Sequence, residues 1–516
     1  MSVYNSIENI LLISPPHPNT IEFPINKTVL FNRKYRCEPP LGLWSLASEL
    51  RLFFPDLNVK VFDLNFQALQ EYLKDNLSPA TWKEVLKGKI KEMCPQIIGI
   101  SCLFATTANI CIETARIVKD ISQTKVIFGG GEVTTNINRF LNEKAIDYCI
   151  SGEGETALIQ LVSALNNTKS LENISGVCFR NEVGKFIINN QTEYSKDLNS
   201  LPLLDPTLLP FEQYPETGRV AGLNNVNEVS IPYETSRGCP FKCTYCSSHN
   251  LWGYSIRYKS IQRISQELDA IKSELDFKHI YLQDDTPFLD KKRSLFILKL
   301  IRERGIVLHL PNSLRVNSLD HEIIDALANS AVKTINLAIE SCNTDTLKDK
   351  MKKNVDIKLV RILIDYIRDN TNMKVTGNIL LGFPGETLDD MYVSLDELKR
   401  LRLDWVDFGI LTPLPGTEVF DLANSHGYIS GNKNGLNYAN ANLETEHFTA
   451  KQVKTIVEKS NIEFNFKNNI NIREGLLERA KEDFEYVLSI APCHVEARNA
   501  LLLCTEKISI NQYGNT

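Results

Sequence analysis

The sequence lacks the features that would place it in a membrane, on a secretory route or along bare nucleic acid. Its longest apolar runs, such as IIGIS and NILLGF, are far shorter than the roughly 20 residues that cross a bilayer. Met1 opens onto SVYNSIEN, which has no basic segment of the kind that begins a signal peptide. The net charge of -6 gives no global basic footprint. We therefore expect a cytoplasmic protein with no membrane span and no nucleic-acid partner.

The sequence has no unusual excess of cysteine, with 12 in 516 residues. Most of them are isolated in apolar, strand-like or helical contexts, where a buried free cysteine behaves as a small hydrophobe. This group includes Cys94, Cys102, Cys111, Cys149 and Cys178. We expect these thiols to be part of hydrophobic cores. A chain of this length that is 43% hydrophobic can bury more than one core and should divide into about three domains.

Residues 1–204 alternate short β-rich runs with amphipathic stretches. The runs are NILLIS, VKVFDL, IIGISCLF, KVIFGG and DYCISG. This alternation is typical of βαβ units, so we predict an α/β domain with a doubly wound parallel sheet and helices on both faces. The strand-rich stretch GVCFRNEVGKFIINN predicts a closing hairpin. The Pro-punctuated run LPLLDPTLLP indicates a linker, which we assign to residues 205–228.

The alternation begins again in residues 229–435. The strand candidates are VSIPYETS, HIYLQDD, VLHLPNS, TINLAIES, TGNILLGF and WVDFGILTPL. Six βα repeats predict a partial or full α/β (TIM-like) barrel, in which function lies on the loops at the C-terminal ends of the strands. Residues 436–516 have helical patterns, and LLERAKEDFEYVLSIAPCHVEARNALLLC resembles a fragment of a tetratricopeptide repeat. One unit is too few for a stable array, so we expect a helical cap packed on the barrel.

One stretch, RGCPFKCTYC, breaks the pattern of isolated cysteines. Cys239, Cys243 and Cys246 have the spacing C-x3-C-x2-C. Three thiolates on one short loop can bind three irons of a [4Fe-4S] cube and leave the fourth iron open to a substrate. Gly238 suits a loop that wraps closely round a bulky cluster. The alternative is a zinc site, which usually has four ligands, and the only nearby fourth candidate is His249.

This cysteine loop, with an aromatic residue just before its third cysteine, resembles that of the radical S-adenosylmethionine superfamily. The resemblance continues in order over residues 229–416 through YETSRGCPFKCTYC, YLQDDTPF, LAIES and GNILLGFPGET. It implies that the amine and carboxylate of S-adenosylmethionine chelate the open iron of the [4Fe-4S] cluster. Electron transfer would then cleave the C–S bond and give a 5′-deoxyadenosyl radical. It also implies a flavodoxin or ferredoxin type electron donor as a partner.

The resemblance further assigns contacts with S-adenosylmethionine to single residues. These are Tyr245 for the adenine, Glu340 and Ser341 for the ribose or methionyl end, and Arg315 for the methionyl carboxylate. The strand from Gly377 to Gly382, followed by Glu386, resembles the adenine-binding segment G-x-I-x-G-x-x-E with a longer spacing to the glutamate. Glu340 and Arg315 have an alternative role, which is to pair with each other inside the barrel mouth. Asp284 and Asp285 are adjacent, so on a strand only one of them can face into the barrel.

The N-terminal region resembles the cobalamin-binding domain that precedes the barrel in many radical S-adenosylmethionine enzymes, the class B members. The ordered segments are EPPLGLWSLAS, VFDLN, PQIIGISCLF, VIFGGGEVT and AIDYCISGEGE. A doubly wound sheet binds its ligand at the C-terminal strand ends, where glycines allow close backbone approach. The cobalamin contacts that the resemblance implies are Pro40, Gly42, Ser101, Gly129, Gly130, Gly131, Gly152, Glu153 and Gly154. The alternative is that the glycines form ordinary turns at strand ends.

The domain departs from cobalamin-dependent mutases in one respect. It lacks D-x-H-x-x-G, whose histidine replaces the cofactor's own base below the cobalt, and its only histidine is His17 in the turn after the first strand. Cobalt would therefore have no histidine lower ligand at the usual loop. The departure also leaves open a domain that has lost the cofactor.

The resemblance implies an enzyme with a [4Fe-4S] cluster, S-adenosylmethionine and cobalamin as cofactors. The main interpretation is a cobalamin-dependent methyltransferase that adds a methyl group to an unactivated carbon of a small-molecule or peptide substrate. The alternative is a radical rearrangement, cyclisation or oxidation without methyl transfer. A third hypothesis, a regulatory protein that senses cobalamin, is disfavoured because a sensor needs no radical initiator.

Overall fold

The computed structural model describes residues 7–17, 37–73, 81–191, 194–217, 228–431, 436 and 441–513. These residues form two compact units. The first extends to Pro240 and continues from Ser247 to Asp285, and the second contains Phe241–Cys246 and the chain from Thr286 onward. Within these described ranges, no helix is both long and apolar enough to cross a membrane.

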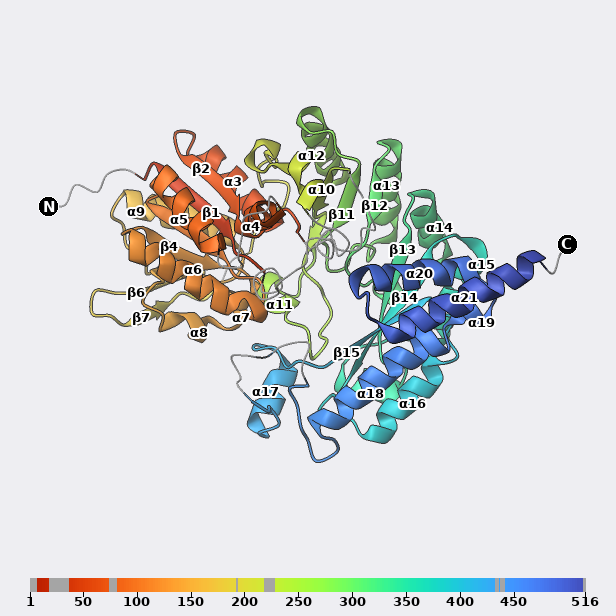
Figure 1. Cartoon of the computed structure of the whole chain (residues 1–516). Helices are drawn as coiled ribbons and strands as arrows, with labels where there is room; N and C mark the ends of the chain where they lie inside the picture. Colours follow the sequence, from red (N-terminus) through yellow and green to blue (C-terminus); the bar gives the residue numbers. More distant parts are fainter. Residues whose placement is uncertain are drawn as a thin grey trace. The chain divides into compact units, whose positions relative to one another are not determined.

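A seven-stranded sheet with the order β2-β1-β3-β4-β5-β6-β7 organises the first unit (Figure 1, red to orange). Its strands are β1 (Asn9–Ser14), β2 (Asn58–Asp63), β3 (Ile97–Ser101), β4 (Lys125–Gly129), β5 (Tyr148–Ile150), β6 (Val177–Arg180) and β7 (Phe186–Ile188). The first five are parallel, and β5, β6 and β7 pair antiparallel. The predicted doubly wound sheet and closing hairpin are confirmed. The order reverses between β1 and β3, and such sheets bind ligands beyond their C-terminal strand ends at this point.

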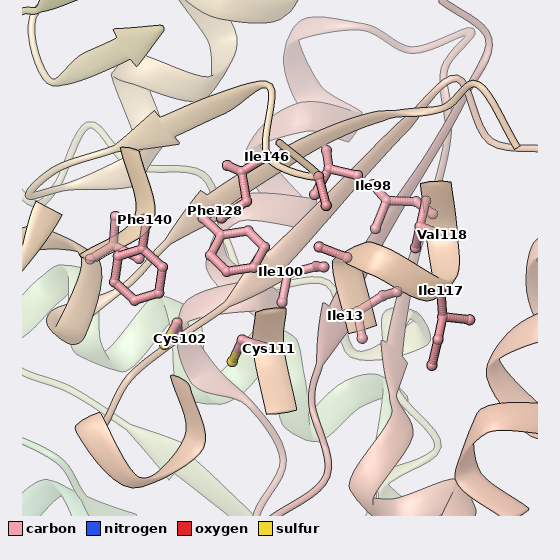
Figure 2. Packing of buried hydrophobic residues seen from close by; sticks show 14 of the residues in the cluster. Ile13, Ile98, Ile100, Cys102, Cys111, Ile117, Val118, Phe128, Phe140 and Ile146 are labelled. Carbon is pink, nitrogen blue, oxygen red and sulfur yellow. The ribbon is translucent and has the colours of Figure 1, made fainter. Parts of the chain in front are cut away.

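Helices connect the strands of this sheet. They are α3 (Leu41–Phe53), α4 (Leu64–Leu73), α5 (Thr81–Met93), α6 (Ala108–Ile121), α7 (Gly131–Thr135), α8 (Ile137–Leu141) and α9 (Gly154–Asn166). Helix α6 illustrates the pattern, because Cys111, Ala115 and Val118 recur at helical spacing and all three are buried. Figure 2 shows this core, in which the rings of Phe128 from β4 and Phe140 from α8 lie 5.6 Å apart.

The isolated cysteines mostly behave as predicted. Cys102, Cys111, Cys149 and Cys178 are buried in this hydrophobic core. Burial raises the pKa of the Cys149 thiol well above its usual range, so it stays protonated. The prediction is wrong for Cys94, which is exposed directly after α5, because the helix ends there and its backbone turns to a φ of 46°.

The remainder of the first unit begins the second alternating region. Its elements are β8 (Ser230–Tyr233), β9 (Ser236–Arg237), α11 (Ser248–Trp252), β10 (Arg257–Tyr258), α12 (Ile261–Glu274) and β11 (His279–Leu282). β8 and β11 are parallel, and their residues are all buried. The short strands β9 and β10 pair antiparallel on either side of the cysteine loop.

The second unit continues the alternation. Its elements are α13 (Lys291–Glu303), β12 (Val307–His309), α14 (His321–Asn329), β13 (Thr334–Glu340), α15 (Ile357–Asn370), β14 (Lys374–Leu381), α16 (Leu388–Leu398), β15 (Trp405–Ile410) and α17 (Glu418–Ser425). β13, β14 and β15 form a parallel sheet. All six segments predicted as barrel strands are therefore strands, and the α/β prediction is confirmed. A complete α/β barrel of the TIM type has eight parallel strands.

The predicted C-terminal helical cap is also present. It consists of α18 (Ala450–Ile462), α19 (Ile470–Arg473), α20 (Leu477–Ile490) and α21 (Val495–Tyr513). Helices α20 and α21 pack on each other through Ala480, Phe484, Ala497 and Cys504. Phe466 joins this cluster and meets Trp405 of β15 edge to face at 5.4 Å, so the helical pair packs against the β13–β15 sheet.

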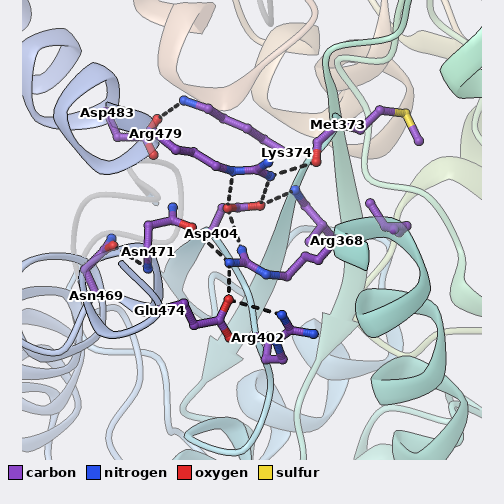
Figure 3. A network of polar contacts seen from close by, with 12 residues as sticks. Arg368, Met373, Lys374, Arg402, Asp404, Asn469, Asn471, Glu474, Arg479 and Asp483 are labelled. Carbon is purple, nitrogen blue, oxygen red and sulfur yellow. Dashed lines mark hydrogen bonds and ion pairs between the residues drawn. The ribbon is translucent and has the colours of Figure 1, made fainter. Parts of the chain in front are cut away.

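A buried ion network fastens this cap to the same sheet (Figure 3). Asp404, 1% exposed, accepts hydrogen bonds from Arg368 of α15 at 2.6 Å and from two nitrogens of Arg479 of α20 at 2.6 Å each. The backbone N–H of Val375 donates to it at 2.7 Å. Arg368 also donates to Glu474 at 2.7 Å. A single carboxylate thus joins a barrel helix, a barrel strand and the cap.

Replacing Asp404 with alanine should lower the free energy of unfolding by about 3–5 kcal/mol, because it leaves two arginines of a buried network without their shared carboxylate. Urea denaturation followed by circular dichroism measures the change. The matched control is Asp396→Ala, since Asp396 pairs with Lys399 on the surface at 2.7 Å with 72% of its side chain exposed. If Asp404→Ala and the control unfold at the same urea concentration, the network does not contribute to stability as proposed.

Candidate functional site

The cysteine loop begins directly after β9, at a backbone conformation that only glycine adopts readily. Gly238 has a φ of 94°, and a Cβ built on it would lie 2.4 Å from the carbonyl oxygen of Ser255. The loop therefore starts with two backbone segments in close contact. Cys239 follows as a half-buried thiol.

Arg237, the residue before this glycine, is the centre of a buried charge cluster. Its guanidinium lies 2.8 Å from Glu155 and 2.7 Å from Glu234, with 4% of the side chain exposed. It also stacks over the ring of Trp252, 5.0 Å from the centroid. Burial alone would lower the pKa of Arg237, but the carboxylates of Glu155 and Glu234 hold it well above its usual value. The arginine is therefore a permanent cation two residues from the first cysteine.

Two further carboxylates border this cluster. Glu153 contacts Arg257 at 2.5 Å and Arg237 at 3.9 Å, and it accepts the backbone N–H of Ser195 at 2.7 Å. Burial, together with the charge of Glu155, raises the pKa of Glu49 to about 7. The GEGE stretch of the N-terminal domain, residues 152–155, thus faces the strand that leads into the cysteine loop.

The adjacent aspartates after β11 take different partners. Asp284 is 2% exposed and accepts hydrogen bonds from the backbone of Thr235 at 2.9 Å and from the hydroxyl of Ser236 at 2.6 Å. Asp285 accepts the hydroxyl of Ser248, at the start of α11, at 2.5 Å. One carboxylate therefore supports the segment before the cysteine loop, and the other supports the helix after it.

In the second unit, Thr244 fixes the later part of the loop. Its backbone N–H donates to the carbonyl of Met351 at 3.1 Å, and its hydroxyl donates to that of Lys350 at 2.7 Å. Its own carbonyl accepts the N–H of Val419 at 3.1 Å. Cys243 and Cys246, on either side of it, are half-buried and joined by a backbone hydrogen bond of 3.2 Å. The backbone of Thr244 and its hydroxyl therefore hold this part of the loop.

In the described part of the chain, no three His, Cys, Asp or Glu side chains converge on one point as ligands of a single metal ion do. His249 stacks on Tyr254 with the ring centroids 4.9 Å apart.

Tyr245 lies between Cys243 and Cys246 in the chain, and its ring meets that of Phe383 edge to face, with the centroids 5.6 Å apart. Glu340, at the end of β13, has a left-handed φ of 69°, a strained conformation that is typical of functional sites. Lys353 connects them, with its ammonium 3.0 Å from the Glu340 carboxylate and 3.3 Å from the Tyr245 hydroxyl. Burial and the Glu340 charge raise the pKa of Tyr245 well above its usual value, so its hydroxyl stays protonated.

Ser341 lies next to this group but has a different environment. It is fully buried, and its hydroxyl donates to Ser394 at 3.1 Å and accepts the backbone N–H of Asn343 at 3.1 Å. These contacts give it a role in shaping the turn after β13.

Arg315 has the features expected of a carboxylate receptor. Its guanidinium lies over the ring of Phe241, 3.4 Å from the centroid, which fixes its plane beside the cysteine loop. Its buried Nε has no hydrogen-bond partner among the described residues. The alternative pairing of Arg315 with Glu340 does not occur, because Glu340 pairs with Lys353. A donor that is buried and unsatisfied fits the methionyl carboxylate that the resemblance implies.

The predicted adenine segment comprises the second half of β14 and the turn that follows it. A Cβ on Gly377 would lie 2.8 Å from the side chain of Ile339, so this glycine permits close packing beside β13. Gly382 has a φ of 93°, and its N–H and that of Phe383 both donate to Glu386, at 2.8 and 3.0 Å. Burial raises the pKa of Glu386 to about 7. The Glu386 carboxylate thus stabilises the turn after β14 by accepting two of its backbone N–H groups.

In the first unit, the glycine turn after β4 packs against the loop after β3. A Cβ on Gly130, whose φ is 109°, would lie 2.7 Å from the carbonyl of Cys102, and one on Gly131 would lie 3.0 Å from that of Leu103. Leu103 and Phe104 are 54% and 52% exposed at these strand ends. The C-terminal edge therefore presents an apolar surface and a side-chain-free backbone turn, which fit the planar ring of a corrin.

The other residues predicted to contact cobalamin are spread over this unit. Pro40 precedes α3, and Gly42 is exposed with no atom within 4 Å of a Cβ built on it. Ser101 ends β3, beside Gly129 in register. Gly152 donates its N–H to Thr134 at 2.8 Å, so its turn is tied to α7. Gly154 begins α9, where a Cβ would lie 3.1 Å from Leu46.

Four residues of the candidate site were not predicted from the sequence. Arg237 lies two residues before Cys239, so its position next to the cysteine motif was a usable signal. Lys353 belongs to a lysine-rich stretch, KDKMKKN, in which nothing distinguishes it from its neighbours. Leu103 and Phe104 directly follow a buried strand, and in the sequence they look like part of it. The pattern of apolar residues does not show where that strand ends.

Comparison with known proteins agrees with this geometry. Residues 233–398 match the model of the radical SAM superfamily, and residues 27–162 match that of the B12 binding domain. An uncharacterized methyltransferase of Pyrococcus horikoshii is 28% identical over 477 residues, which cover 91% of this chain and 95% of that protein. The cytidylyl-2-hydroxyethylphosphonate methyltransferase of Streptomyces wedmorensis is 26% identical, over 76% of this chain and 79% of that protein.

Among solved structures, the fold is similar to that of the radical S-adenosylmethionine methyltransferase TsrM from Kitasatospora setae, determined with cobalamin and a [4Fe-4S] cluster bound. The TM-score is 0.62 at 17% identity, covering 83% of this chain and 76% of that one. The chain therefore contains an N-terminal domain that matches the B12 binding domain, followed by a domain that matches the radical SAM superfamily and includes the cysteine loop.

Proposed function

We propose that this chain is a cobalamin-dependent radical SAM methyltransferase that acts on an unactivated carbon of a small-molecule or peptide substrate. The observation that carries the proposal is that one chain joins a B12-binding domain to a radical SAM domain with a complete C-x3-C-x2-C loop. The alignment of the Pyrococcus horikoshii methyltransferase with 91% of the chain supports methyl transfer as the reaction.

When bound, the cluster supplies the electron that cleaves S-adenosylmethionine, and cobalamin supplies a carrier for the methyl group. Cys239, Cys243 and Cys246 would hold the cluster by their thiolates. Arg315 would bind the methionyl carboxylate, and Glu340 the ribose or methionyl end. In the N-terminal domain, the turn from Gly129 to Gly131 and the apolar side chains of Leu103 and Phe104 would receive the corrin. The protein orients these groups and excludes water from them.

The proposal extends to the organisation of the chain and its environment. Residues 1–204 bind cobalamin, 205–228 form the linker, 229–435 form the radical SAM core and 436–516 form the helical region. Residues 218–227 of the proposed linker lie outside the described residues. A flavodoxin or ferredoxin type protein of the cytoplasm would deliver the electrons.

With its true substrate, the enzyme should consume two S-adenosylmethionine molecules for each methyl group that it transfers. One becomes S-adenosylhomocysteine, and the other becomes 5′-deoxyadenosine and methionine, so the two coproducts should appear in equal amounts. Mass spectrometry with S-adenosylmethionine labelled on its methyl group measures both the coproducts and the mass added to candidate substrates.

The control is Cys246→Ala, which should abolish formation of 5′-deoxyadenosine while the protein still binds hydroxocobalamin with its visible absorption bands. Product that carries no added methyl mass, formed with 5′-deoxyadenosine but without S-adenosylhomocysteine, would overturn the methyltransferase proposal in favour of rearrangement or cyclisation. Failure to retain any corrinoid when the cluster is intact would overturn it as well.

A further inference from the structure

A buried lysine beside the cysteine loop has no role in the assignments above. The Lys353 side chain is only 5% exposed, and its ammonium contacts the carboxylate of Glu340 at 3.0 Å and the hydroxyl of Tyr245 at 3.3 Å. A buried ammonium is costly unless it is paired and hydrogen-bonded. Both of its partners are residues that the radical SAM resemblance places against S-adenosylmethionine.

The backbone around Lys353 is held as firmly as its side chain. A π-helical turn at Thr346–Lys350 precedes it, and such turns are frequent at functional sites. The N–H of Lys353 donates to the carbonyl of Leu347 at 2.8 Å, and that of Met351 donates to Thr346 at 3.0 Å. The ammonium therefore projects from a rigid segment.

The same segment also holds the backbone of the cysteine loop. The carbonyls of Lys350 and Met351 accept both hydrogen bonds that Thr244 donates, at 2.7 and 3.1 Å. Lys353 then holds the hydroxyl of the next residue, Tyr245. One short segment thus fixes two successive residues that lie between Cys243 and Cys246.

Glu340 gives the contact its second function. Its φ of 69° persists only if its surroundings fix it, and Lys353 supplies an ion pair with its carboxylate at 3.0 Å. Lysine also neutralises the charge of a carboxylate that is largely buried, since only 13% of the Glu340 side chain is exposed. Without the ammonium, the carboxylate would be free to turn away from the direction in which it meets a ligand.

We propose that Lys353 is a positioning residue of the S-adenosylmethionine site, which acts by fixing Glu340 and Tyr245 together beside Cys243 and Cys246. The inference rests on the radical SAM part of the proposed function and is independent of methyl transfer. It predicts that loss of the ammonium weakens binding of S-adenosylmethionine and leaves the cluster in place.

The test uses the full chain with its cluster reconstituted anaerobically. Lys353→Gln should keep the iron content of the wild type, because no cluster ligand changes. It should raise the KM for S-adenosylmethionine in 5′-deoxyadenosine formation by about ten- to a hundredfold, the range that corresponds to one hydrogen bond with a charged partner. The kcat should change less than the KM. Addition of S-adenosylmethionine should perturb the electron paramagnetic resonance spectrum of the reduced cluster less than in the wild type.

Two further variants separate positioning from a merely structural ion pair. Lys353→Arg keeps the charge and should recover part of the lost affinity. Lys352→Gln is the matched control and should leave both readouts unchanged, because Lys352 is the neighbouring lysine and pairs with Glu418 on the surface with 52% of its side chain exposed.

A Lys353→Gln protein with wild-type KM and a wild-type spectral response would overturn the inference. If that variant fails to fold, the double variant Glu340→Gln, Lys353→Gln removes both buried charges, and a wild-type KM in this protein would overturn it equally. A wild type that cleaves S-adenosylmethionine but transfers no methyl group would overturn the methyltransferase proposal alone. A wild type that neither binds nor cleaves S-adenosylmethionine would overturn both.

Discussion

Replacing Cys243 with alanine should remove most of the iron from the anaerobically reconstituted protein. A [4Fe-4S] cube on three thiolates already has one iron without a protein ligand, so the loss of a second ligand leaves the cluster held at two corners. The iron and sulfide contents should fall from about four atoms of each per chain to a small fraction of that value, as measured by chemical analysis. The visible absorption of the cluster should be lost together with the iron.

Other variants define the specificity of this loss. Cys94→Ala removes an exposed, isolated cysteine and should keep the full iron content. His249→Ala tests the zinc alternative and should also keep the cluster, since His249 is not a ligand in this proposal. A protein in which Cys239, Cys243 and Cys246 are all alanine and which still binds a full cluster would contradict the assignment.

Replacing Arg237 with methionine should have the second large effect. The substitution keeps most of the side-chain volume but leaves Glu155 and Glu234 buried without their cation, and Glu153 loses a neighbour at 3.9 Å. Removing one partner of a buried ion pair costs about 3–5 kcal/mol. Because Gly238 and Cys239 follow directly in the chain, we expect a lower thermal midpoint together with a lower iron content.

Lysine at this position tests what the arginine supplies. Arg237→Lys keeps the charge but cannot reach Glu155 and Glu234 through one planar fork, so it should restore only part of the stability. Arg400→Met is the surface control, because Arg400 pairs with Glu397 while 70% of its side chain is exposed. Arg237→Met with the thermal midpoint and iron content of this control would show that the buried cluster has no influence on the cysteine loop.

The strand segments and the cysteine loop could be predicted because each is written in a short stretch of sequence. Apolar runs of four to eight residues between helical stretches predict parallel strands wherever they occur. The spacing of Cys239, Cys243 and Cys246 requires no knowledge of distant residues, since a loop that short brings its thiols to one region in any fold. The helical cap was predictable for the same reason.

The roles of several polar residues depended on partners that the sequence does not reveal. Arg237 and Glu155 are 82 positions apart in the chain yet 2.8 Å apart in space. The same holds for Asp404 and Arg479, which are 75 positions apart and 2.6 Å apart. Glu340 showed no sign in the sequence of which cation it pairs with, and its pairing with Arg315 was an open alternative.

The sequence by itself determined the order of the two α/β regions, their alternation of strands and helices, and the spacing of the three thiols in the cysteine loop. These are properties of local patterns, because backbone hydrogen bonding and burial act on neighbouring residues first. Only the tertiary structure decided which buried charges meet. It joined Lys353 to Glu340 and Tyr245, and Arg237 to the GEGE stretch. A buried ion must find its counterion in three dimensions, and the packing of whole elements sets that distance.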